Sequence, residues 1–390
     1  MNIDRTKVLD QLGRHSLMVG AVALVLSFIL GLLPGFHVSF FNAYLFAWLF
    51  WLGISLGGMG LTMMHFLTGG DWGTLIRPIT SSAARALPIM LLLFLPIMFG
   101  MYDLFPWARP DLVASDPILH HQHKYLNSSF FFIRVLIYFA VWIALSWPVT
   151  AWPTGPGPRL RALSAPGLLM YVVLMTLAGV DWIMSRQPHW MSTVFGFIMV
   201  ISQTLSALCF TLIILWLRAD RPKILKFARP GVFIDLGNLV LTLVILWAYL
   251  NFSQYLITWT GDEQKEIGWY VQRTYGGWRA VAGLLLLLHF LVPFILLLFR
   301  DIKQNINRLG MLAGALLLLR ILDLYWDVGP LRQDNPHGGF VISPLDVLAW
   351  IGIGGIWYAV FSKSLSRRPL LAEFPIEPQP SNGTESAQPA

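Results

Sequence analysis

The sequence predicts an all-α, polytopic membrane protein with about ten transmembrane helices. Ten runs of roughly 18 or more mostly apolar residues follow one another with short polar gaps, and each can cross a hydrocarbon core about 30 Å thick. The composition agrees, because 56% of the residues are hydrophobic and only 12% are charged, whereas soluble domains carry about 25% charged residues. Backbone groups inside a bilayer must be hydrogen-bonded within the chain, so continuous apolar runs indicate helices; a barrel would show alternating segments of about ten residues.

The predicted spans divide the chain into ten hydrophobic segments and one polar tail. In order, they cover residues 16–36, 41–66, 86–105, 127–149, 167–185, 190–217, 232–258, 278–299, 306–326 and 343–363. The first is long for the apolar core of a secretory signal and no small-residue cleavage site follows it, so we expect a retained helix. Residues 364–390 are rich in Pro, Ser, Gln and Glu, a composition that predicts a disordered cytoplasmic extension.

The basic residues predict how the chain is oriented. The loops on the N-terminal side hold 18 of the 27 Lys and Arg residues, and the opposite loops hold seven. The 18 are Arg5, Lys7, Arg14, Arg77, Arg85, Arg159, Arg161, Arg218, Arg221, Lys223, Lys226, Arg229, Arg300, Lys303, Arg308, Lys363, Arg367 and Arg368. Cytoplasmic loops carry the excess of Lys and Arg, so both termini are expected in the cytoplasm. The net charge of +7 is therefore a topology signal, and we expect no nucleic-acid partner.

Ionisable side chains within the spans mark the candidate site, because charges at membrane depth are unfavourable. Arg320 and Asp323 are three residues apart in the ninth span, so they share a helix face. This pair predicts either a proton or quinone-headgroup site or an internal ion pair that fixes helix packing. His289 lies near mid-bilayer in the eighth span, before Pro293, whose missing N–H would loosen the helix. It is either a functional histidine or one bonded to a neighbouring carbonyl.

Further polar residues lie at or near the outer ends of the spans. They are Asp103, Arg134, Asp181, His189 and Asp346. They could meet there, or each could serve only in interfacial capping and salt bridging. Asp181 and His189, together with the polar groups of the eighth and ninth spans, predict a connected polar route from mid-membrane to the outer surface.

Two polar residues lie at the inner ends of spans. His65, at the end of the second span, precedes Thr68, Gly69 and Gly70. It could take part in proton uptake, but a loop turn also explains these glycines. Asp235, at the start of the seventh span, is either an acid for proton uptake or a first-turn charge that suits the helix dipole.

The ligand sets for a bound cofactor are incomplete. The single cysteine, Cys209, allows neither an internal disulfide nor a four-cysteine cluster, and no CxxCH haem motif is present. The histidines within the spans lie at different depths, unlike the axial ligands of a membrane haem. His120, His121 and His123 resemble part of a metal site, but no further ligand lies in register with them. We expect this chain to bind no haem, metal or cluster.

Several long motifs recur in order along most of the chain. FNAYLFAWLFWLG spans 41–53, HFLTGGDWG spans 65–73, DWIMSRQPHWMSTVFG spans 181–196 and RILDLYW spans 320–326. Shorter ones are WY at 269–270, RT at 273–274, GGW at 276–278, HF at 289–290 and PF at 293–294. With these motifs the chain resembles the ActF subunits of bacterial alternative complex III, which are membrane subunits of NrfD/PsrC type.

The resemblance implies a subunit of a quinol:cytochrome c (or copper protein) oxidoreductase in a respiratory or photosynthetic chain of the bacterial cytoplasmic membrane. Quinol is then the substrate of the complex. The implied partners are a sister NrfD-like subunit with the quinol site, an iron–sulfur protein, multihaem and monohaem cytochromes c, small membrane subunits and lipids. Haem c and the iron–sulfur clusters lie in these partners. This chain would support quinol oxidation and proton translocation without a cofactor of its own.

Two other functions stay open. A purely structural anchor would use its buried polar groups only to lock helix packing. An independent transporter is the third candidate, although no internal repeat or inverted half is visible in the sequence.

Overall fold

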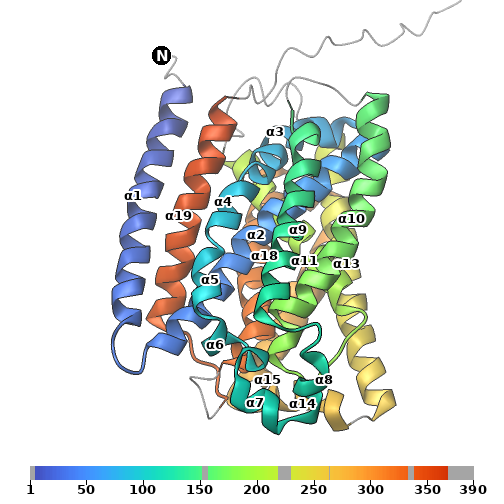
Figure 1. Cartoon of the computed structure of the whole chain (residues 1–390). Helices are drawn as coiled ribbons and strands as arrows, with labels where there is room; N and C mark the ends of the chain where they lie inside the picture. Colours follow the sequence, from blue (N-terminus) through green and yellow to red (C-terminus); the bar gives the residue numbers. More distant parts are fainter. Residues whose placement is uncertain (1–4, 152–156, 218–229, 263, 333–337, 368–390) are drawn as a thin grey trace, which may run out of the picture.

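The chain folds into a bundle of membrane-length helices (Figure 1). The computed structural model describes residues 5–151, 157–217, 230–262, 264–332 and 338–367, and their regular structure is entirely helical. Ten segments in this part are long and apolar enough to cross a membrane, which confirms the all-α, polytopic class. The basic loop 218–229 and most of the tail, from residue 368 on, lie outside the described residues.

The spanning segments are, in order, α1 (Arg5–Gly31), α2 (His37–Thr68), α3 to α5 (Asp71–Ala84, Leu87–Leu92, Leu95–Phe99), α9 (Ser128–Val149), α10 (Pro158–Trp182), α11 (Phe195–Trp216), α13 (Pro230–Gly261), the run α15, η3 and α16 (Trp278–Leu284, Leu285–Leu291, Val292–Leu298), α18 (Ile306–Val328) and α19 (Pro344–Ser366). The connecting helices are α6 (Met101–Leu104), η1 (Pro106–Ala108), α7 (Pro110–Ser115), α8 (Pro117–Gln122), η2 (Met184–Arg186), α14 (Gln264–Gln272), α17 (Arg300–Gln304) and η4 (Gly329–Leu331).

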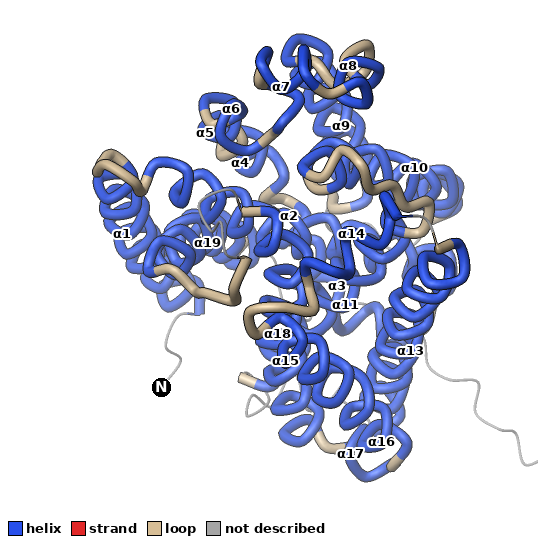
Figure 2. The backbone as a smooth tube through the Cα atoms, turned by 90° about the horizontal axis from the view of Figure 1, so that it is seen from below, coloured by secondary structure: helices blue, strands red, loops and turns tan. Residues whose placement is uncertain are grey.

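The first and last helices pack as an antiparallel pair at the edge of the bundle (Figures 1 and 2). A Cβ on Gly20 would lie 2.8 Å from the carbonyl oxygen of Gly352, so glycine permits this close approach. Gly13, nearer the start of α1, lies against Ser362, nearer the end of α19. The start of α1 and the end of α19 therefore lie at the same end of the bundle, which we call the terminal end. The opposite end, with α6 to α8 and α14, is the loop end.

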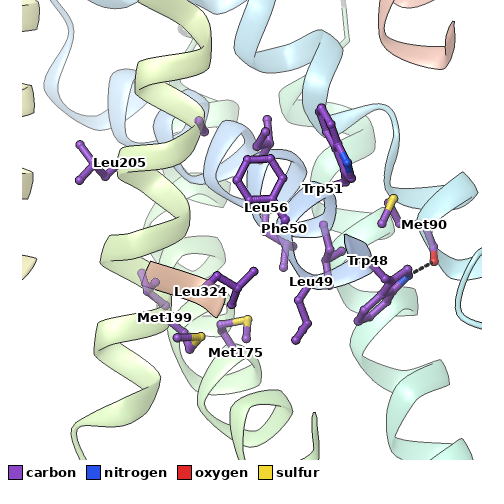
Figure 3. Packing of buried hydrophobic residues seen from close by; sticks show 14 of the residues in the cluster. Trp48, Leu49, Phe50, Trp51, Leu56, Met90, Met175, Met199, Leu205 and Leu324 are labelled. Carbon is purple, nitrogen blue, oxygen red and sulfur yellow. Dashed lines mark hydrogen bonds between the residues drawn. The ribbon is translucent and has the colours of Figure 1, made fainter. Parts of the chain in front are cut away.

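The central helix is α2, which contacts α3, α10, α11, α18 and α19 (Figure 2). Its whole apolar stretch is buried inside the protein. Glycines on α2 allow neighbouring backbones to come close, because a Cβ on Gly57 would lie 2.2 Å from the carbonyl oxygen of Gln203 on α11. Large aromatic side chains fill the remaining space (Figure 3). The ring of Trp48 lies 4.9 Å from that of Trp182, and its indole N–H donates to the Met90 carbonyl at 2.8 Å.

Two spanning segments depart from a regular α-helix. The third begins at Asp71 and not near the predicted residue 86, and its second and third parts, α4 and α5, each begin with a proline at the first turn. Proline lacks an N–H and ends the helix before it. The eighth contains the π-helical segment η3 directly before Pro293, where the sequence predicts a loosened helix.

Candidate functional site

Arg320 and Asp323 form a buried ion pair one helical turn apart on α18. They are 3% and 4% exposed. The Asp323 carboxylate also accepts a hydrogen bond of 3.2 Å from the indole N–H of Trp247 on α13. Arg320 donates to the hydroxyl of Ser206 on α11 at 3.4 Å. The predicted pair thus exists and joins three helices, with Asp323 about 8 Å from the loop end of α18 at 1.5 Å per residue.

His289 lies beside this pair, on η3. Its ring is fully buried and its centroid is 4.2 Å from that of Trp247, the same indole that donates to Asp323. Neither ring nitrogen has a hydrogen-bond partner in the described part of the chain. The alternative of a histidine bonded to a neighbouring carbonyl is therefore not the arrangement found. Trp247 thus contacts both predicted features, the Arg320–Asp323 pair and His289. We call His289, Trp247, Arg320 and Asp323 the Asp323 cluster.

Asp181 and Arg134 form a second buried pair, which joins α10 to α9. The Arg134 guanidinium donates to both carboxylate oxygens, at 2.9 and 2.8 Å. The hydroxyl of Tyr138 donates to the same carboxylate at 2.8 Å, and Arg134 also donates to the Tyr125 carbonyl at 2.7 Å. Asp181 is fully buried with three donors around it. This saturated, bidentate geometry is typical of a structural pair.

The other predicted residues near the loop end do not join this pair. Asp103 lies 2.9 Å from His37, and His189 lies 3.0 Å from Asp116. The expectation that the five residues could meet is therefore wrong for all but Arg134 and Asp181, because Asp103, His189 and Asp346 each pair with a residue outside this set. Asp116 lies outside the spans, and the hydrogen bond from the Ile118 N–H is the main cause that lowers the pKa of its carboxyl.

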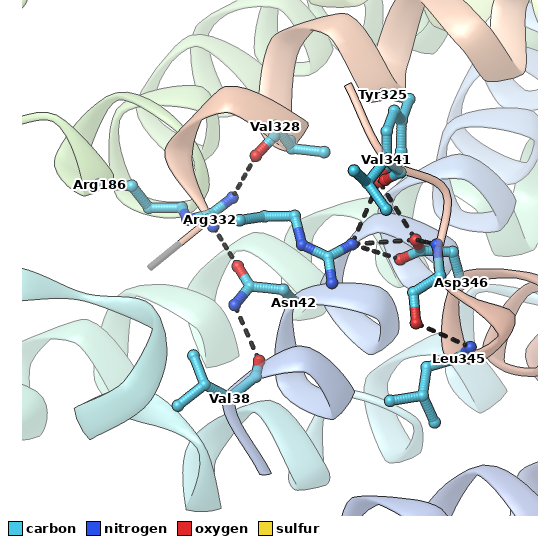
Figure 4. Close-up of polar contacts among 10 residues, drawn as sticks. Val38, Asn42, Arg186, Tyr325, Val328, Arg332, Val341, Leu345 and Asp346 are labelled. Atoms are coloured by element: carbon cyan, nitrogen blue, oxygen red, sulfur yellow. Dashed lines mark hydrogen bonds and ion pairs between the residues drawn. The ribbon is translucent and has the colours of Figure 1, made fainter. Parts of the chain in front are cut away.

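Asp346 is the remaining member of that set, and it caps α19 (Figure 4). Its carboxylate accepts from the Ser343 N–H at 2.7 Å and from Arg332 at 2.8 and 2.9 Å. Tyr325 donates to the same carboxylate at 3.1 Å. The capping alternative therefore describes Asp346. Apart from its charge, nothing in the sequence marks Arg332 as the partner of Asp346.

Arg186 connects α2 with the end of α18 and with η4 near the loop end (Figure 4). It donates to the side-chain oxygen of Asn42 on α2 and, at 3.2 Å each, to the carbonyls of Val328 and Leu331. The side chain comes from the motif at 181–196, so part of that motif serves helix packing.

Arg273 is a further buried arginine that sequence reasoning did not single out as a site. Its guanidinium donates to the carbonyls of Trp326, Trp269 and Asp327, at 3.0, 2.8 and 2.7 Å. It also lies 3.3 Å from the Trp269 ring centroid, a cation–π contact. Burial lowers the pKa of Arg273 to about 9, which leaves it charged at neutral pH.

The inner candidates lie at the terminal end, away from the Asp323 cluster. His65 is 3% exposed and bonds through Nε2 to the Gly70 carbonyl at 3.1 Å. Gly69 and Gly70 have φ of +71° and +94°, so His65 steadies a turn that needs glycine. Asp235 is exposed on α13.

The predicted metal ligands lie on and just after α8. His120, His121 and His123 are all exposed. Within the residues that the structure describes, no group of three possible metal ligands converges on one point.

Two cavities border the Asp323 cluster. One of about 680 Å³ is lined by Trp247 and Asp323, among others. The other, of about 20 Å³, is lined on its polar side by Ser202, Gln203, Ser206 and Arg320 and could hold one water molecule.

The chemistry that this arrangement supports is proton exchange. A carboxylate and an imidazole both contact the indole of Trp247, and the indole and the carboxylate line a cavity. The predicted site residues thus fall into separate groups: the Asp323 cluster, the Asp181 pair, the His189 pair and the His65 turn. No known family model matches the chain, and no curated protein does.

Proposed function

We propose that this chain is an integral membrane subunit of a quinol-oxidising electron-transport complex of the alternative complex III type. In this proposal the Asp323 cluster exchanges protons during quinol oxidation. The motif resemblance supports the assignment to such a complex, and the ten spans agree with it. The loop end would face outside, and both termini would lie in the cytoplasm of a bacterium.

The observation that carries the proton role is His289. A histidine that only fixed packing would be expected to use its polar nitrogens, because a buried polar group without a hydrogen bond is destabilising by about 1–3 kcal/mol. His289 uses neither within the described structure. Ionisable groups held at membrane depth in this way typically mark proton relays.

The Asp181 pair provides an internal comparison. Its carboxylate receives donors from Arg134 and Tyr138 on both oxygens, and no imidazole forms part of the group. The Asp323 cluster has an acid, a histidine without hydrogen bonds to any described residue, and a neighbouring cavity. The two buried acids are thus expected to differ in role, with Asp181 structural and Asp323 functional.

Because His289 makes no hydrogen bond to the residues that the structure describes, its replacement separates function from assembly. We expect His289→Phe to leave the complex intact and to lower quinol turnover or proton release about a hundredfold or more, the range for loss of a proton-transfer group. Leu285→Met, a buried change on the same π-helical segment, is the matched control. Turnover and proton release should be measured on the purified complex with a soluble acceptor.

A structural anchor is the second candidate. Three buried or half-buried arginines favour it, because each bonds to an acceptor in another part of the bundle. Arg186 and Arg273 donate to backbone carbonyls, and Arg332 donates to a carboxylate. Unchanged turnover and proton release in His289→Phe would support the anchor and refute the proton role. Isolation of the chain without haem c subunits under mild conditions would instead revive an independent transporter.

A further inference from the structure

The cavity of about 680 Å³ has a defined direction in the bundle. It lies between α13 on one side and α14, α15 and α18 on the other. Along α13 its lining extends from Ile245 to Tyr255, ten residues or about 15 Å. Tyr255 is about 9 Å from the end of α13 at Gly261. The cavity therefore runs from near the loop end toward the middle of the membrane.

The two ends of this cavity differ in chemistry. Arg273, Thr274 and Arg279 line it near the loop end. Its lining toward mid-membrane includes Ile245 and Leu286, and most of the wall is apolar. An amphiphile with its polar head at the interface and its chains pointing inward would match this gradient. That is the orientation of a phospholipid in the leaflet at the loop end.

The charge near the head position is positive. Arg279 is exposed, and it forms no ion pair among the residues described. Three of the five N–H groups of Arg273 bond to carbonyls, which leaves two. With the neighbouring Arg320, three arginines stand against two aspartates, Asp323 and Asp327, which by formal charge leaves one positive charge in excess.

A neutral donor adds to this preference. Trp326 lines the cavity, and its indole N–H is buried without an acceptor in the described part of the chain. Arginine and indole N–H groups suit phosphate and ester oxygens, which only accept hydrogen bonds. Tyr255, an exposed aromatic side chain in the part of the lining nearest the loop end, is of a type enriched at the membrane interface.

We propose that this cavity is a specific site for one anionic phospholipid. The phosphate would lie between Arg279 and the free N–H groups of Arg273, and an acyl chain would follow α13 toward Ile245. The proposal is independent of quinol oxidation, because it needs only the cavity, its polarity and its charge.

The first test removes the charge at the head position. The full-length protein, delipidated in detergent, is titrated with phosphatidylglycerol or phosphatidylcholine, and bound lipid is measured by native mass spectrometry. We expect tighter binding of phosphatidylglycerol, and about fivefold weaker binding in Arg279→Gln. Arg300→Gln removes the same charge from an exposed position at the terminal end and should bind like the wild type.

The second test fills the cavity without changing its charge. Ala282→Phe places a ring in the lining, whereas Gly283→Phe, the matched control, points into open space with no atom within 4 Å of its Cβ. Only Ala282→Phe should lose phosphatidylglycerol. Equal affinity for the two lipids, or wild-type binding in both Arg279→Gln and Ala282→Phe, would overturn the proposal. Displacement of phosphatidylglycerol by an equal concentration of decylubiquinone would assign the cavity to a quinone and overturn the proposal as well.

Discussion

Replacing Asp323 with asparagine removes the negative charge of the buried pair and leaves Arg320 without a charged partner in it. Arg320 would keep the hydroxyl of Ser206, at 3.4 Å, and a neutral amide as acceptors. Removing one partner of a buried ion pair typically destabilises by about 3–5 kcal/mol. Because asparagine still accepts hydrogen bonds, we expect a value near 3 kcal/mol. Ser206→Ala, which removes only the long contact, should cost less than about 1 kcal/mol.

The double change Arg320→Met with Asp323→Leu separates charge from packing. It removes both charges of the pair, and the main loss is the acceptor of the Trp247 N–H, which costs about 1–3 kcal/mol. The double variant should therefore be no less stable than either single variant. Unfolding in mixed micelles with increasing SDS, followed by tryptophan fluorescence, measures these differences. If the two single effects simply add in the double variant, the pair is not coupled and the reasoning is refuted.

Three further outcomes are expected. Gly57→Ala should destabilise by about 1–3 kcal/mol in the same unfolding assay, because its Cβ would meet a carbonyl of α11, whereas Gly283→Ala, in open space, should not destabilise. The lowered pKa of Asp116 means that its stabilising contribution is present above the unfolded value, about 3.9, and is lost as the pH falls through the folded value. Hydrogen exchange of α8, corrected for intrinsic rates, should then rise below about pH 4 in the wild type, and in Asp116→Ala should be high throughout. A cysteine at His121 should react with an impermeant reagent from the periplasm and one at Asn307 only from the cytoplasm; the reverse pattern would invert the topology.

Hydropathy located the spanning helices well where both length and apolar content were high. It placed the third span too late, because α3 carries Arg77, Thr80, Ser81 and Ser82, all of which are buried inside the protein. A polar residue that packs against other helices and one that faces water look alike in a hydropathy profile. The interruptions at the start of α4 and α5 could be read locally, since proline acts within its own turn.

The candidate site shows the same division between local and distant information. Arg320 and Asp323 are one turn apart, so helix geometry alone predicts their contact. Arg134 and Asp181 are 47 residues apart, and only the packing of α9 on α10 selects this partner for Asp181. The role of Trp247 depends on the rotation of α13 about its axis, which a single sequence does not encode in any short pattern.

The pairing of α1 with α19 affects how the chain can assemble. Helices enter the membrane in order of synthesis, yet the glycine face of α1 finds its counterpart only when the last helix has been inserted. The central helix α2 also gains a contact only at the end of synthesis, since its Ser55 accepts a hydrogen bond from Trp357, 302 residues later. Contacts of such sequence separation form late and slowly. A nascent chain that stops before residue 344 would expose the small-residue surface of α1 to lipid, where quality-control proteases or another helix could engage it.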